Sequence, residues 1–141
     1  MLRIFPLLLV SIIIYNVLAL AHGLAGHAQM EAFLANHVTF HMFSGDDWDF
    51  SAGDCLIVFS LVMLFFEVIK ATRTTRHELL NHGLSALTFV IALVEFIVLR
   101  GFSTSVFFII MIMAAIDVVA GYTISIVAAE HDLGLGRAGT D

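Results

Sequence analysis

The chain has 141 residues, of which 60% are apolar and only 13% carry a charge. A soluble domain has about 25% charged residues, so this composition excludes a protein whose whole surface faces water. The formal net charge of −6 and the lack of a basic cluster exclude a typical nucleic-acid-binding protein. The single cysteine, Cys55, excludes an internal disulfide and a zinc site built from cysteines.

Four apolar segments lie along the chain, over residues 4–22, 53–70, 79–100 and 104–129. Crossing the hydrocarbon core of a bilayer takes about 20 helical residues. The segments lack the alternation of polar and apolar residues that a transmembrane β-barrel strand shows. We therefore predict an all-α fold, in which four transmembrane helices form one bundle over residues 1–130. Residues 131–141 are rich in glycine and are expected to form a flexible C-terminal tail.

The basic residues predict the orientation of this bundle, because basic residues gather on the inner side of a membrane. With the N-terminus inside, the inner side holds five of them, and the outer side holds only Arg100. The inner residues are Arg3, Lys70, Arg73, Arg76 and Arg137. We predict an N-in, C-in protein of a bacterial-type inner membrane, with the loop 23–52 on the periplasmic side. A short interfacial helix is expected within that loop.

The first apolar segment also has features of a cleaved signal peptide. Ala19, Leu20 and Ala21 match the small-x-small pattern that signal peptidases recognise. The apolar run is longer than the usual hydrophobic region of about 7–15 residues, which favours a retained span. The sequence alone leaves open whether residues 1–21 are removed.

Each predicted span carries a stripe of small and polar residues on one side. Such residues drive the association of helices in lipid, where hydrophobicity supplies no force between them. At about 1.5 Å of rise per residue, one polar residue of each stripe or beside it comes near mid-membrane. We predict that these four, Asn16, Ser60, Thr88 and Asp117, form one buried polar layer. The stripes are Ser11, Tyr15, Ala19 and His22; Gly53, Ser60 and Glu67; Asn81, Ser85, Thr88, Ala92 and Glu95; and Ala114, Asp117, Gly121, Ser125 and Ala128.

Three acidic residues are staggered through the predicted membrane. Glu95 is placed near the outer face, Asp117 in the middle and Glu67 near the inner face. Carboxyl groups at staggered depths are typical of a proton or cation path. The alternative is a structural role, in which Asp117 holds the helices together and the other two form ion pairs. The alternative pairs are Glu67 with Lys70 or His82, and Glu95 with Arg100.

The outer loop is rich in histidine. On one helix spanning this segment, His27, Glu31, His37 and His41 would share a face. Imidazole groups suit copper and zinc, so one hypothesis is a periplasmic copper or zinc site on these four residues. The alternatives are a helix lying on the membrane surface and a pH sensor. Haem is not expected, because no two histidines face one another at a similar depth.

Two segments resemble known sequences: Phe65-Phe66-Glu67-Val68-Ile69-Lys70 and Ile116-Asp117-Val118-Val119-Ala120-Gly121. Together with their surroundings, over about residues 45–127, they resemble a group of small bacterial inner-membrane proteins with several spans. The resemblance implies the topology and carries no activity.

No set of residues in the chain points to catalysis, so we do not expect an enzyme. The leading hypothesis is a non-catalytic accessory or assembly subunit of a larger membrane complex. Its partners would be the lipid bilayer and other membrane subunits, or further copies of the chain. Candidate residues for a docking face are Phe107, Phe108, Met111 and Met113.

Overall fold

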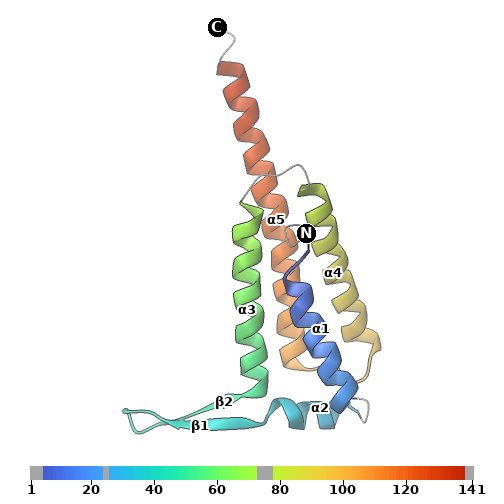
Figure 1. The fold of residues 1–141 in the computed structure, drawn as a ribbon, viewed down its shortest axis with the longest axis vertical. Coiled ribbons are helices and arrows are strands. Elements are labelled where there is room, and N and C mark those ends of the chain that lie inside the picture. The colour runs from blue at the N-terminus through green and yellow to red at the C-terminus, as the bar shows by residue number, and fades with distance from the viewer. Residues whose placement is uncertain (1–4, 24–25, 73–77, 139–141) are drawn as a thin grey trace.

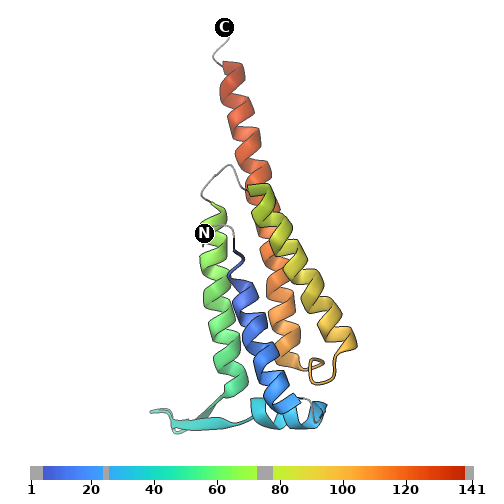
Figure 2. The same ribbon diagram turned by 45° about the vertical axis from the view of Figure 1, so that its right-hand side comes forward.

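The structure is a computed structural model that describes residues 5–23, 26–72 and 78–138. Four helices, α1, α3, α4 and α5, run side by side, and a short helix and a β-hairpin lie across one end of this bundle (Figures 1 and 2). In chain order the elements are α1 (Leu8–Leu18), the π-helix η1 (Ala19–Gly23), α2 (His27–Leu34), β1 (His37–His41), β2 (Asp47–Ser51), α3 (Ala52–Ala71), α4 (Glu78–Val98) and α5 (Ser105–Ala138).

Within the described residues, three helices are long and apolar enough to cross a membrane: Ala52–Ala71, Asn81–Val98 and Ser105–Val127. These agree with three of the four predicted spans. The remaining predicted span, over residues 4–22, differs from the other three. Residues 8–22 and α2 pass the same test only as a pair, and they are bent by 117° with respect to each other.

Polar stripes face the inside of the bundle, and apolar side chains face outward. On α3, Gly53, Ser60 and Glu67 are buried, whereas Leu61 and Phe65 are more than half exposed. The other helices show the same arrangement, with Ser11, Tyr15, Ser85, Thr88, Ala92, Ala114, Asp117 and Gly121 buried. An apolar outside around a partly polar inside is the arrangement expected where lipid surrounds the helices.

The loop between the first two predicted spans contains more than the expected interfacial helix. Helix α2 ends at Leu34, and the chain then forms an antiparallel hairpin of β1 and β2. His37 and His41 lie on β1 rather than on a helix, so the prediction that they share a helical face with His27 and Glu31 is wrong. The residues of β1 alternate between polar and apolar, which is the period of a strand.

The C-terminal residues also differ from the prediction. Helix α5 has 34 residues and continues to Ala138, where a flexible tail was expected from residue 131. It extends well past the ends of the other helices (Figure 1). Each glycine in a helix costs only about 1 kcal/mol relative to alanine, so Gly134 and Gly136 do not end a long helix that is otherwise rich in alanine and isoleucine.

Candidate functional site

A group of buried and partly buried polar side chains lies where α3 ends and α4 begins. We call it the polar cluster, and we call the opposite end of the bundle the hairpin end. The cluster joins three helices, because its members come from α3, α4 and α5. Its members are Glu67, Lys70, Asn81, His82, Ser85, Asp117 and Ser125.

Glu67 ties the start of α1 to α3. Its side chain is only 1% exposed, and its Oε2 atom accepts a hydrogen bond from the backbone N–H of Leu7 at 2.9 Å. An N–H group at the start of a helix has no partner within that helix, so the carboxylate satisfies it. Lys70 Nζ lies 2.6 Å from Glu67 Oε1 and donates to the Phe5 carbonyl at 2.8 Å. The pairing of Glu67 with Lys70, one of the two considered from the sequence, is present.

His82 packs tightly between α4 and α5. The ring is 7% exposed, and its Nε2 atom lies 2.6 Å from Ser125 Oγ. Opposite the ring is Gly121, where an added Cβ would lie 2.6 Å from His82 Nδ1. The Tyr122 ring flanks the imidazole at a centroid distance of 5.4 Å. The histidine therefore acts as a packing group that only a glycine can face.

Asp117 is a buried acid of α5. Its side chain is 5% exposed, and Ser85 of α4 lies nearby. Ser85 is itself buried and belongs to the predicted stripe of α4. Asp117 therefore lies near polar residues of two other helices, Ser85 on α4 and Glu67 on α3.

A second set of polar contacts fixes α1 nearer the hairpin end. Asn16 Nδ2 donates to both carboxylate oxygens of Glu95, at 3.0 and 3.1 Å. The Tyr15 hydroxyl donates to the Gly101 carbonyl at 3.0 Å and lies 2.6 Å from Thr104 Oγ1. The stripe of small and polar residues predicts that Tyr15 faces the other helices. It does not predict the two partners, because both belong to the turn between α4 and α5.

The predicted single polar layer does not form among the described residues. Ser60 Oγ donates to the Leu56 carbonyl at 2.7 Å, and Thr88 Oγ1 donates to the Leu84 carbonyl at 2.8 Å. A serine or threonine within a helix often bonds to the carbonyl four residues earlier, and it then needs no partner on another helix. Asn16 bonds to Glu95 on α4 rather than to any of the other three.

Among the described residues, no hydrogen bond or ion pair joins Glu95 to Asp117. Ser85, which lies near Asp117, is ten residues before Glu95 on α4, or about 15 Å along the helix. Proton transfer needs groups within hydrogen-bond reach, about 3 Å apart or joined through a water molecule. Most described side chains buried over that length are apolar: Ile12, Leu56, Ala92, Ile110, Met113 and Ala114.

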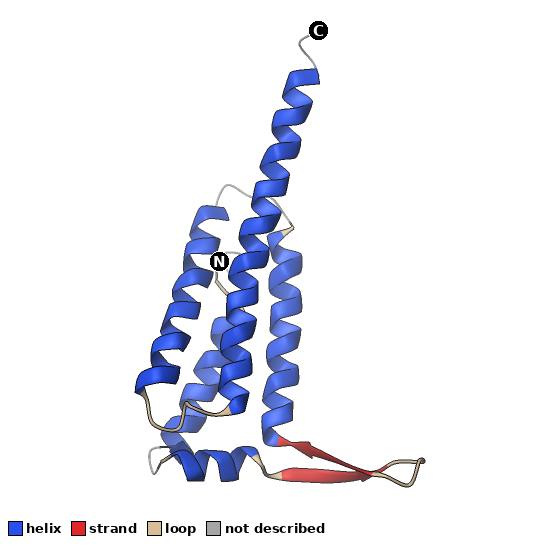
Figure 3. Ribbon diagram, turned by 180° about the vertical axis from the view of Figure 1, so that it is seen from behind, coloured by secondary structure: helices blue, strands red, loops and turns tan. Residues whose placement is uncertain are grey.

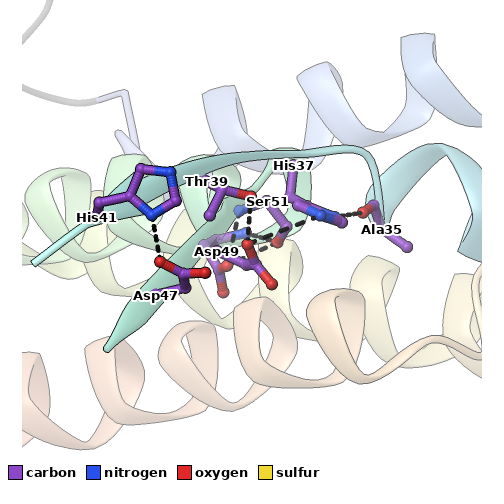
Figure 4. A network of polar contacts seen from close by, with 8 residues as sticks. Ala35, His37, Thr39, His41, Asp47, Asp49 and Ser51 are labelled. Carbon is purple, nitrogen blue, oxygen red and sulfur yellow. Dashed lines mark hydrogen bonds and ion pairs between the residues drawn. The ribbon is translucent and has the colours of Figure 1, made fainter. Parts of the chain in front are cut away.

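The predicted metal ligands are not brought together. On the hairpin, His41 contacts Asp47, and His37 Nε2 lies 3.7 Å from Asp49 Oδ1 (Figure 4). His27 pairs with Glu31 on α2, at 3.2 Å. Four residues along a strand span about 13 Å, too far for His37 and His41 to bind one ion. No group of three or more possible ligands occurs in residues 5–23, 26–72 and 78–138.

The predicted docking face is also corrected. Phe107 is 0% exposed, and Met111 and Met113 are buried in the core of the bundle. Only Phe108 of that set faces outward. The aromatic group of Tyr15, Phe102 and Phe107, with centroids 4.6 to 5.3 Å apart, explains why this part of α5 turns inward.

No family model matches this chain, and neither a curated protein nor a solved structure matches it. The resemblance to small bacterial inner-membrane proteins therefore stays a prediction.

Proposed function

We propose that the chain is a four-span protein of a bacterial-type inner membrane, with both termini inside, that serves as a non-catalytic accessory or assembly subunit. The observation that carries this proposal is the pairing of the buried polar groups. Glu67, Asn16 and His82 each bond to a group of another helix or to the start of one. The bonding capacity of these groups is used to hold helices together, and the outer surface is apolar.

The fourth span in this proposal is α1 with η1. Its 16 residues extend over about 24 Å, which is less than the hydrocarbon thickness of about 30 Å. Polar contacts at both ends of α1, to Glu67 and to Gly101, support a position among the other three helices. The views in Figures 2 and 3 also place α1 alongside them.

Site-specific photo-cross-linking in native membranes tests the subunit role. A photoreactive residue is placed at an exposed position on each of three helices: Phe65, Ile97 or Val119. We expect at least one position to give a single adduct of defined mass that contains a second protein. Ile12, which is 1% exposed, is the matched control and should give no intermolecular adduct. Lipid adducts alone at all three exposed positions would contradict the proposal.

A proton or cation conduit through Glu95, Asp117 and Glu67 is the alternative proposal. The burial of Asp117 beside Ser85 and near Glu67 favours it for one half of the membrane. The apolar interval toward Glu95 weighs against it for the other half, unless a second chain supplies polar groups there.

A further inference from the structure

The β-hairpin has two unlike faces. In its register, Val38 lies opposite Phe50 and Phe40 lies opposite Trp48, which puts four apolar side chains on one face. The Phe40 and Trp48 rings are 5.7 Å apart, and Trp48 and Phe50 are 5.4 Å apart. The opposite face carries His37, Thr39, His41, Asp47 and Asp49, which bond to one another (Figure 4).

The apolar face, which we call the aromatic face, is largely uncovered by the described part of the chain, and only Phe50 of its four side chains is partly buried. Val38 is 64% exposed and Trp48 is 50% exposed. Met42 and Phe43, at the turn between the strands, are exposed as well. A lone two-stranded hairpin is at best marginally stable in water, so this face needs a surface to cover it.

The position of the hairpin indicates what that surface is. Strand β2 runs directly into α3, and a capping box between Ser51 and Asp54 fixes the start of this membrane-crossing helix. The hairpin lies across the end of the bundle and projects sideways past α3 (Figures 1 and 3). The outward side chains of α3 are apolar, so lipid lies beside this helix. The hairpin therefore extends over lipid, at the level where α3 leaves the membrane.

We propose that the aromatic face rests in the headgroup region of the bilayer beside α3, with the histidine and aspartate side chains turned toward water. Trp and Tyr are enriched at this depth of a membrane, because an amphipathic ring suits the boundary between lipid and water. Three aspartates, Asp46, Asp47 and Asp49, lie in or near the polar face, so the contact is with apolar chains and neutral headgroups rather than with anionic lipid.

Trp48 is the only tryptophan of the chain, so its fluorescence reports on this hairpin alone. The full chain is reconstituted into phosphatidylcholine vesicles with bromine atoms on the acyl chains, near the carbonyl end or near the methyl end. Because an indole ring at headgroup depth lies close to the first set of bromines, we expect roughly twofold quenching by them and little by the second set. Aqueous iodide should quench Trp48 weakly.

Two variants in a Trp48→Phe background serve as matched controls. Phe40→Trp places the reporter on the same face and should repeat the behaviour of Trp48. Thr39→Trp places it on the polar face, and iodide rather than bromine should quench it. Equal iodide quenching on both faces, with no bromine quenching at Trp48, would overturn the proposal and would point to a protein partner for this face. Because these vesicles contain no other protein, that result leaves the subunit role to the cross-linking experiment.

Discussion

The contact between Gly121 and His82 makes a sharp prediction about how α4 and α5 pack. A Cβ at Gly121 would lie 2.6 Å from His82 Nδ1 and 2.8 Å from Cε1. Ordinary contacts are about 3.5–4.0 Å, so Gly121→Ala forces the ring or the helix to move by about 1 Å. The ring has little room to do so, because it is buried and its Nε2 atom is bonded to Ser125.

We expect Gly121→Ala to lower the free energy of unfolding by about 1–3 kcal/mol, the usual cost of overpacking a core. The assay is unfolding in mixed micelles with a rising fraction of sodium dodecyl sulfate, followed by circular dichroism. Gly83→Ala is the matched control, because nothing lies within 4 Å of the Cβ it adds. In a His82→Ala background the added methyl group should cost much less. Equal effects of Gly121→Ala and Gly83→Ala would refute the reasoning.

Three further predictions concern the buried acids and α1. Glu67→Ala should cost about 3–5 kcal/mol in the same assay, because it leaves Lys70 and the Leu7 N–H without their partner, and Glu67→Gln should cost less. Identical losses for the two variants would show that the carboxylate has no special role. In proteoliposomes, Asp117→Asn should leave the proton flux at the level of the unaltered chain, because mostly apolar side chains separate Asp117 from Glu95. A loss of flux would favour the conduit. Deleting residues 1–21 removes the buried Leu8, Ile12 and Tyr15 and should abolish the cooperative unfolding transition, whereas an unchanged transition would show that α1 is dispensable.

The spacing of small and polar residues predicted the interior of the bundle well. Gly53, Ser60 and Glu67 recur every seven residues, and all three are buried. The spacing is informative because lipid accepts apolar side chains at any outward position, so the small and polar residues turn toward the other helices. His22, which was assigned to a stripe but is exposed, stacks on Phe33 at 4.2 Å where the chain bends toward α2.

The partners of the polar groups were harder to predict than their burial. Counting 1.5 Å per residue gives the height of a side chain but neither the tilt nor the rotation of its helix. Asn16 was therefore placed level with Asp117, whereas its long-range partner is Glu95. The hairpin was missed for a different reason. Residues four apart, such as His37 and His41, share a face on a helix and also on a strand, so this spacing does not distinguish the two.

The contacts of α1 bear on whether the first segment is a signal peptide or a span. The N–H of Leu7 is bonded to Glu67 at one end, and the hydroxyl of Tyr15 is bonded to the turn before α5 at the other. Between them, Leu8 and Ile12 are each 1% exposed. A peptidase acting after Ala21 would leave Glu67 without its N–H donor and Glu95 without Asn16, and each loss uncovers a buried or partly buried carboxylate. This cost to the three remaining helices supports the proposal that α1 stays in the mature bundle as a fourth span.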